Sequence, residues 1–464
     1  VLSVSSSSPS CLRFFAAKPY TYTGDICIAV NPYQWLPLYS TELREQYLDG
    51  ESKKQMPPHV YATSASAFQH MRDNSQSQSV LVSGESGAGK TEVARLSLQY
   101  LSHACDASSQ SSVLLEDVLR ANHLMEFIGN AETQHNGNSS RFGKLLSVRY
   151  ARDGAPLGAR VTTHLLERCR VVAPEAPDGA FRIFYAVLDD AQSNDEFALH
   201  AIPRILLGRV DAAVPSSWST FGALCDALRL DPSVARMVQH TVVGILSLNL
   251  RDFAHMASIL DTEKNVAYTV VNRRMIVGNE VIWTACDLDE IKARCRALAM
   301  HLYQRMFDAV VAALNAHLAT EEEQEAARFN VLDMFGFECM TETANGLDQL
   351  CINYANERLH KLFLDAAVVS QEQLYLAEGL PWEAPPVGVA HRRGLDACEQ
   401  HVFRLMDEAE RTKGDAFALV DTIVAACPDA AIAPKVRTKE AIFVLHHYAR
   451  PVRYTAADFV ARNV

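Results

Sequence analysis

The segment that most restricts the possible folds of this chain is a glycine-rich loop between an apolar stretch and an amphipathic one. Gly84–Thr91 reads GESGAGKT, which fits the pattern G-x-x-x-x-G-K-[ST]. Ser79–Ser83 before it predicts a short strand, and Glu92–Leu101 after it predicts a helix. In this order the glycines let backbone N–H groups surround phosphate oxygens, and the helix N-terminus adds a positive potential. A turn without a ligand explains this context poorly, so we expect a phosphate-binding loop.

Two side chains at the end of this loop suit a nucleoside triphosphate site. Lys90 can reach the β- and γ-phosphates, and Thr91 offers a hydroxyl to Mg²⁺. Both would lie at the start of the helix, where its N-terminus also attracts phosphate.

Two later segments could complete such a site. Asn136–Lys144 (NGNSSRFGK) carries two consecutive hydroxyls beside an arginine, which could ligate Mg²⁺ and sense a γ-phosphate. Asp333–Glu338 (DMFGFE) begins with a carboxylate at the end of an apolar strand, a suitable place near Mg²⁺. Gly336 would let a backbone N–H approach the γ-phosphate closely. Taken singly, each segment is equally well explained as an ordinary polar loop.

The remaining pattern predicts strands interleaved with helices, hence an α/β sheet core. A chain of 464 residues is too long for one simple core, so we expect several subdomains. Predicted strands are Thr23–Val30, Arg141–Tyr150 and Phe329–Asp333. Predicted helices start at Phe181 and cover Ala293–Leu318 and Asp348–Glu378, whereas Ala107–Ser112 and Glu321–Glu323 should be surface loops.

Composition narrows the class of protein. The net charge of −12 argues against nucleic acid or an anionic membrane surface as the main partner. Eleven cysteines occur without a CxxC pair, which favours reduced thiols over a structural zinc site. No apolar run approaches the roughly 18 residues of a membrane span, and the first residues lack the positive charge of a signal peptide. Since Val1 is no natural start and Phe459–Val464 has a helical pattern, we expect a part of a longer protein.

The three motifs, in this order, resemble the phosphate loop, switch one and switch two of myosin heads. Further matches extend the resemblance to about residues 20–463. They are Asn31–Tyr39 with the purine-binding loop, Pro58–Tyr61, Phe127–Ala131, Leu350–Tyr354 at the start of the relay helix, Glu372–Trp382 with the relay loop, and His447–Ala449 with an HYAG strand.

The resemblance implies ATP and Mg²⁺ as cofactors of an actin-activated, Mg-dependent ATPase. It places the adenine beside Asn31, Pro32 and Tyr39. It places the phosphates among Gly84, Glu85, Ser86, Gly87, Ala88, Gly89, Lys90, Thr91, Glu92, Asn136, Ser139 and Ser140. It implies that Thr91 and Ser140 hold Mg²⁺, with Asp333 just behind them. Its catalytic residues would be Lys90, Ser139, Arg141, Gly336 and Glu338, with Arg141 and Glu338 as a salt bridge and the water proton passing to the γ-phosphate through Ser139.

The fold implied by the resemblance is α/β, with a mostly parallel, twisted central sheet flanked by helices and two helical actin-facing subdomains. Its nucleotide core would span about 20–145, its upper actin-facing part 146–328, and switch two, relay helix and part of the lower actin-facing subdomain 329–464. The N-terminal barrel, converter, lever and tail would lie outside this chain. The implied partner is filamentous actin, with light chains or calmodulin bound only through the lever, and the implied location is the cytoplasm, on the cytoskeleton. We expect no nucleic acid and no membrane contact from this segment.

Departures from the family pattern gather on the actin side. Met406–Phe417 matches the actin-binding helix–loop–helix weakly, and Arg450 replaces the glycine after His447–Ala449. Gly137 replaces a common aspartate, while the other nucleotide motif residues are intact. Glu280 stands at the offset of the family's acidic or phosphorylatable residue, so we expect it to regulate actin contact.

Two other functions compete with a motor ATPase. One is a myosin-like actin tether with slow or unproductive ATP turnover. The other is a phosphoryl-transfer enzyme such as a P-loop kinase, which shares only Gly84–Thr91 and leaves both switch segments unexplained. The intact switch residues favour the motor ATPase.

Overall fold

A computed structural model describes residues 9–23, 26–48, 56–104, 109–133, 136–172, 179–197, 199, 202–203, 207, 217–260, 265–278, 280–319, 325–340, 345–381, 393–412, 414–432, 440–457 and 459. The chain forms two compact units, which are described separately. Unit 1 comprises Val1–Trp35, Ser83–Ala88 and Phe335–Val464, and unit 2 comprises Leu36–Val82 and Gly89–Met334.

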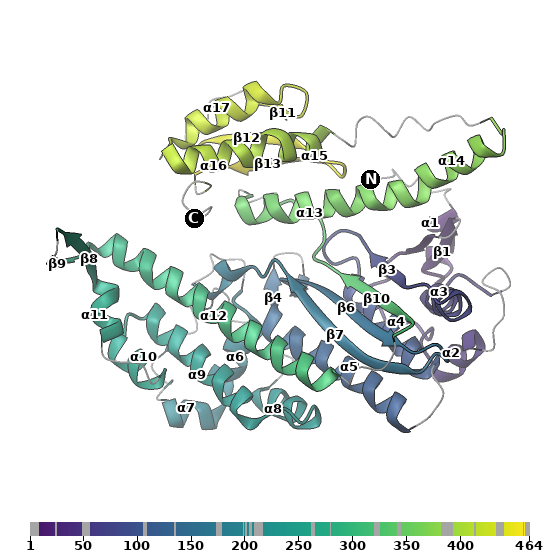
Figure 1. The fold of residues 1–464 in the computed structure, drawn as a ribbon, viewed down its shortest axis with the longest axis horizontal. Coiled ribbons are helices and arrows are strands. Elements are labelled where there is room, and N and C mark those ends of the chain that lie inside the picture. The colour runs from purple at the N-terminus through teal and green to yellow at the C-terminus, as the bar shows by residue number, and fades with distance from the viewer. Residues whose placement is uncertain are drawn as a thin grey trace. The chain divides into compact units, whose positions relative to one another are not determined.

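Unit 2 is built on a four-stranded sheet in the order β3-β10-β6-β7 (Figure 1). Its strands are β3 (Gln78–Val82), β10 (Ala327–Asp333), β6 (Gly143–Tyr150) and β7 (Pro156–His164). Three of these were expected from the sequence within a few residues. β10 runs parallel to β3, with Asp333 beside Val82 in register, and antiparallel to β6. The ends of β3 and β10 therefore lie at the same edge of the sheet.

The expectation of a mostly parallel sheet is wrong for this sheet. Among its pairings only β10 with β3 is parallel, and β10–β6 and β6–β7 are antiparallel. For β6 and β7 the reason is the short turn after Tyr150, where the Ala151 N–H donates to the Ala155 carbonyl and Gly154 adopts φ 87°. Such a turn returns the chain directly beside β6, as a hairpin must. Strand periodicity carries no information on direction, so the sequence pattern did not reveal this.

Helices pack on this sheet. α3 (Val60–Asn74) and α4 (Lys90–Ala104) contact β3 and β10, and α5 (Ser109–Gly129) and α12 (Leu288–Leu318) contact β7 (Figure 1). α12 buries Met306 and Val310 on the face that its apolar spacing predicts. The Asn315 side chain accepts from the Val161 N–H at 2.8 Å and donates to its carbonyl at 2.9 Å, which fixes α12 to β7.

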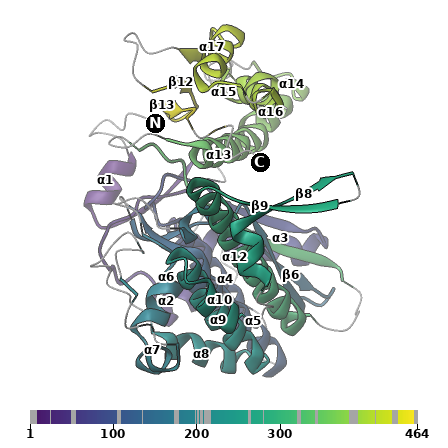
Figure 2. The ribbon, with the colours of Figure 1, turned by 90° about the vertical axis from the view of Figure 1, so that its left-hand side faces the viewer.

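The rest of unit 2 is mainly helical, apart from two small antiparallel hairpins. Its other helices are α2 (Thr41–Leu48), η1 (Arg168–Val171), α6 (Arg182–Asp189), α7 (Ala191–Phe197), α8 (Trp218–Ala227), α9 (Pro232–Asn249), α10 (Phe253–Ile259) and α11 (Asn265–Val271). The hairpins are β4 (Asn130–Thr133) with β5 (Asn136–Ser140), and β8 (Asn272–Val277) with β9 (Glu280–Ala285). Figure 2 shows β8 and β9 projecting beyond the helices of this unit.

Unit 1 combines helices with two antiparallel sheets. Its elements are α1 (Pro9–Phe15), β1 (Tyr20–Thr23), β2 (Ile26–Ala29), α13 (Leu347–Leu364), η4 (Asp365–Val369), α14 (Ser370–Ala377), α15 (Arg393–Ala397), η5 (Cys398–Val402), α16 (Phe403–Thr412), α17 (Ala416–Ala426), β11 (Ala431–Ile432), β12 (Ile442–His446) and β13 (Pro451–Thr455). One apolar core joins α13, α16, α17 and the β12–β13 hairpin, with Leu350, Phe443 and Tyr454 fully buried.

One helix prediction and one loop prediction need adjustment. The helix expected over Asp348–Glu378 is present, but the π-helical segment η4 divides it into α13 and α14. The loop expected over Ala107–Ser112 is wrong from Ser109 on, because α5 starts there despite its polar first turn. Apolar residues further along α5 pack against α4 and β7, so tertiary contacts outweigh the weak local preference. Glu321–Glu323 and Trp382 lie outside the described residues. In the described part of the chain, no helix has the length and apolarity needed to cross a membrane.

Candidate nucleotide-binding site

The phosphate loop has the backbone that its glycines predict. The chain leaves β3 at Val82, and α4 begins at Lys90. Gly84, Gly87 and Gly89 have φ angles of 154°, 79° and 91°, which residues with a side chain rarely adopt. Lys90 and Thr91 form the first turn of α4, whose N-terminal N–H groups suit an anion.

Two segments of unit 1 hold the first half of this loop. The Asn31 side-chain amide donates to the Gly87 carbonyl at 2.9 Å, and the Tyr33 hydroxyl donates to the same oxygen at 3.4 Å. Glu85 pairs with Phe337 as an isolated parallel bridge. The structure thus brings the predicted adenine-side segment and the predicted switch two segment to the phosphate loop.

The carboxylate of Asp333 lies at the sheet edge where β3 ends. Asp333 is the last residue of β10 and sits opposite Lys144 of β6 in register. The Lys144 Nζ is 3.3 Å from Asp333 Oδ2 and 3.6 Å from Glu126 Oε1, which are distances of ion pairs. All three side chains are largely buried, so this charge pairing is needed to offset their loss of water.

Within the described part of the chain, some buried oxygens have no hydrogen bond. Neither carboxylate oxygen of Asp333 accepts one, and the hydroxyl of Ser140 in β5 has no partner there either. Burying such groups without partners is costly. Hydroxyl and carboxylate oxygens are ligands that Mg²⁺ and its bound water prefer. The residues present therefore fit a magnesium ion.

The switch one segment is anchored by polar contacts. Asn136–Ser140 forms β5 and pairs with β4, with Ser139 opposite Ala131. The Asn138 side-chain oxygen accepts from Asn130 Nδ2 at 3.0 Å and from Arg182 Nη1 at 2.7 Å. These contacts fix the position of β5, the short strand that contains Asn136, Ser139 and Ser140.

Arg141 is fully buried and bound by a carboxylate that sequence reasoning missed. Its Nε donates to Glu167 Oε2 at 2.5 Å, and Arg170 Nε donates to the same oxygen at 2.5 Å. Arg141 Nη1 also donates to Ser139 Oγ at 3.2 Å. Burial alone raises the pKa of Glu167, but the charges and hydrogen bonds of the two arginines outweigh it and lower the pKa to about 2. The only local signal was the spacing of Glu167 and Arg170, which share a helical turn.

Switch two is held by α13 on both sides of Gly336. Asn353 accepts from the Glu338 N–H at 2.8 Å and donates to the Glu338 carbonyl at 2.7 Å. Asn356 donates to the Phe335 carbonyl at 3.0 Å. These hydrogen bonds join the predicted switch two segment to α13, the helix predicted to be the relay helix. Glu338 and Arg141 belong to different units, so their salt bridge stays a prediction.

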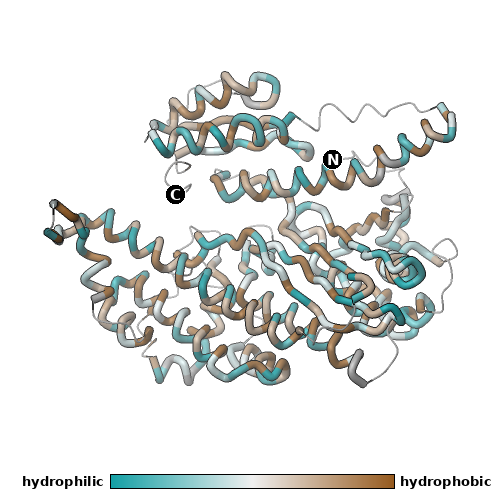
Figure 3. Tube along the Cα trace, viewed as in Figure 1, coloured by the Kyte–Doolittle hydropathy of each residue, from teal (hydrophilic) through white to brown (hydrophobic). Residues whose placement is uncertain are grey.

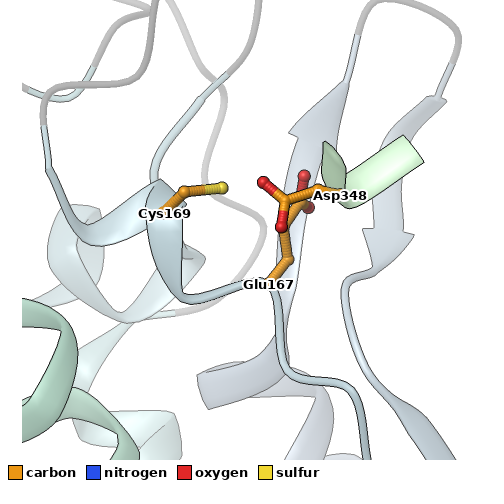
Figure 4. A group of neighbouring side chains, drawn as sticks. All are labelled: Glu167, Cys169 and Asp348. Atoms are coloured by element: carbon orange, nitrogen blue, oxygen red, sulfur yellow. The ribbon is translucent and has the colours of Figure 1, made fainter. Parts of the chain in front are cut away.

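The group Glu167, Cys169 and Asp348 does not make a metal site in our interpretation (Figure 4). The Glu167 carboxylate already binds two arginines. Cys169 lies in η1 of the same unit, and Asp348 comes from the first turn of α13 in the other unit.

The remaining predicted residues are more scattered. Tyr39 lies in unit 2, where its ring is 5.8 Å from that of His59. Glu280 begins β9 opposite Val277 and is exposed. Trp382, the last residue of the predicted relay loop, lies outside the described residues.

Comparisons with known proteins agree with the motifs. The model of the family described as myosin head (motor domain) matches residues 11–204 and 241–464. Unconventional myosin-Ia of Homo sapiens is 32% identical over 403 residues, covering 80% of this chain and 38% of that protein. Unconventional myosin-Ic of Bos taurus is 29% identical over 500 residues, covering 97% of this chain and 46% of that protein. The chain thus spans less than half the length of these relatives.

Proposed function

Because the chain belongs to the myosin head (motor domain) family, we propose that it is the ATPase part of an actin-based motor. In this proposal it binds Mg-ATP, hydrolyses it, and couples hydrolysis to switch two and α13. The observation that carries the proposal is that, among the described residues, the buried oxygens of Asp333 and Ser140 have no hydrogen-bond partner. Asp333 lies beside the last residue of β3, the strand that leads into the phosphate loop.

The proposed binding roles follow the chemistry of each group. Lys90 and the loop N–H groups bind the phosphates, and Asn31, Pro32 and Tyr39 contact the adenine. Thr91 and Ser140 hold Mg²⁺, with Asp333 orienting its water. Bound Mg²⁺ supplies charge neutralisation for the phosphate oxygens.

The proposed catalytic roles rest on positioning rather than covalent chemistry. Ser139 lies beside the attacking water. It accepts a proton from that water and donates its own hydroxyl proton to the γ-phosphate. Its hydroxyl accepts a hydrogen bond from Arg141, which orients the serine proton away from the arginine. Arg141 and Glu338 close the switches, and Gly336 offers its backbone N–H to the γ-phosphate.

We assign filamentous actin as the partner, with the β8–β9 hairpin as one contact. Ile276, Val277 and Val281 are 67%, 58% and 48% exposed there. Figure 3 shows apolar and hydrophilic colours side by side at its end. Such an exposed apolar surface is typical of a protein interface. Glu280 would supply a fixed negative charge for this contact.

The alternative of an actin tether with slow turnover keeps actin binding and lacks efficient hydrolysis. The deciding experiment is phosphate release by the full-length protein, with and without filamentous actin. We expect Mg-dependent release that actin accelerates. Nucleotide binding without actin-accelerated release would favour the tether, and absence of ATP binding would contradict both functions.

A further inference from the structure

The turn between β12 and β13 carries an unusual residue. His447–Arg450 connects the two strands, and the His447 N–H donates to the Arg450 carbonyl at 3.3 Å. Arg450 stands where the resembled family has glycine. Nothing in the proposed function uses this arginine.

Arg450 contacts the phosphate loop directly. Its Nη2 donates to Glu85 Oε1 at 2.6 Å, within unit 1. The two side chains are 44% and 53% exposed, so the pair lies in a solvent-accessible place. Glu85 is the second residue of the loop, and its backbone pairs with Phe337 of switch two. The arginine therefore restrains the loop at the point where switch two meets it.

The turn itself has a rigid base. His447 Nδ1 is 2.7 Å from Glu357 Oε2 of α13, and its Nε2 is 2.8 Å from the Tyr454 hydroxyl. The Tyr448 N–H donates to Glu357 Oε1 at 3.2 Å. Because His447 and Glu357 are buried, these hydrogen bonds fix the backbone from which Arg450 extends.

Tyr448 adds an apolar contact between the turn and switch two. Its ring stacks on that of His360 at 4.2 Å and meets the Phe337 ring edge-on at 5.6 Å. Burial, with the charges of Glu357 and Glu85, raises the pKa of Tyr448 to about 12, so the hydroxyl stays neutral near pH 7. One turn thus touches α13, switch two and the phosphate loop.

We propose that Arg450 is a positioning residue of the nucleotide site, which restrains the phosphate loop through Glu85 and slows nucleotide release. This inference rests on the proposed function. Removing the guanidinium takes one partner from the Glu85 side chain and loosens the loop, while the groups that bind phosphate stay unchanged. Nucleotide dissociation should accelerate more than the hydrolysis step changes.

The test is stopped-flow dissociation of a fluorescent ADP analogue from the full chain. Arg450→Ala should release it faster by up to about fivefold, the range open to an exposed ion pair. Arg450→Lys should restore most of the slow release, because a cation remains. Arg453→Ala is the matched control, since Arg453 is an exposed arginine on the same hairpin. Raising the salt concentration should reduce the difference between the unchanged chain and Arg450→Ala.

A double-mutant cycle with Glu85→Gln separates this role from a merely structural one. If the two residues act as a pair, Arg450→Ala should add little to a chain that already carries Glu85→Gln. Fully additive effects, or equal release by Arg450→Ala and Arg453→Ala, would overturn the positioning role alone. If the unchanged chain bound no analogue, the proposed function would fail, and the positioning role with it.

Discussion

Two buried charge clusters in unit 2 differ in how completely they are paired. In the first, Glu167 receives hydrogen bonds from both Arg141 and Arg170. In the second, among the described residues, Asp333 is paired with the ammonium of Lys144 at 3.3 Å, and its oxygens accept no hydrogen bond. The first, which we call the matched cluster, has its carboxylate bound by both arginines and can serve as a structural anchor. The second, the unmatched cluster, has carboxylate oxygens that can still bind a ligand. The comparison thus distinguishes Glu167, which holds the switch one segment through Arg141, from Asp333, which is suited to magnesium.

The largest effect should come from reversing charge in the matched cluster. Arg141→Glu places a new carboxylate beside Glu167, so single-turnover hydrolysis should fall by about 1000-fold, the upper scale for losing one electrostatic group. Glu338→Arg should do the same if the switches close through a salt bridge. Nucleotide binding by Gly84–Thr91 should persist in each variant that remains folded, and urea unfolding checks this because Arg141→Glu also breaks the buried pair with Glu167.

Combining the two reversals tests the bridge. The double variant should recover a substantial part of hydrolysis, because opposite charges meet again. Adding Glu167→Gln should improve the recovery, since it removes the carboxylate that repels the glutamate introduced at position 141. No recovery in the double or triple variant would contradict the Arg141–Glu338 pair.

A smaller loss of activity should follow a change in the unmatched cluster. Asp333→Asn should lower Mg-dependent phosphate release by about 100-fold through weaker ordering of the metal's water. It should cost less stability than Glu167→Gln, because no hydrogen bond is lost and Lys144 keeps Glu126 at 3.6 Å. Unfolding in urea measures the loss of stability, and phosphate release over a range of magnesium concentrations measures the loss of activity. Normal magnesium dependence in this variant would remove Asp333 from the metal site.

Glu167→Gln should mainly affect stability. Removing one partner of a buried pair costs about 3–5 kcal/mol, because the arginines stay buried without their counterion. Glu116→Gln is a control, since its exposed pair with Arg120 should contribute less than about 1 kcal/mol. Urea unfolding of both variants checks this. Equal stability losses would show that the matched cluster is no anchor.

The same glutamate predicts a pH dependence. Its pKa is about 2 in the folded state, against 4.5 for the ordinary group. Because the unfolded chain takes up the proton first as pH falls, this stabilisation is complete above about pH 5 and declines toward pH 2. The stability difference between the unchanged chain and Glu167→Gln should shrink over that window. A difference independent of pH from about 6 to about 3 would contradict the lowered pKa.

The smallest effect should lie outside both clusters. Glu280→Ala should reduce actin activation by a few-fold and change actin-free hydrolysis less, because Glu280 is exposed at the start of β9. Steady-state phosphate release over a range of actin concentrations measures this. Equal loss with and without actin would count against a role in actin contact.

The sequence was most informative where the chemistry is contiguous. The phosphate loop, β10 with its terminal Asp333, and the long α12 were expected because their patterns are local. The direction of β7 was not predictable, since the turn after Tyr150 sets it and the strand pattern does not. Glu167 was missed because its partner Arg141 is 26 residues away. Arg450 appeared only as a departure from the family, because Glu85 is 365 residues distant along the chain.

The π-helical segment Asp365–Val369 gives the rod formed by α13 and α14 a stored extra residue. A π-helical turn contains one residue more than the α-helical ladder needs. If that residue were expelled, every side chain after Val369 would rotate by about 100° around the helix axis, the angle of one α-helical step. Since α13 is hydrogen-bonded to switch two, a small displacement of switch two along the helix axis would then produce a rotation of α14 about that axis.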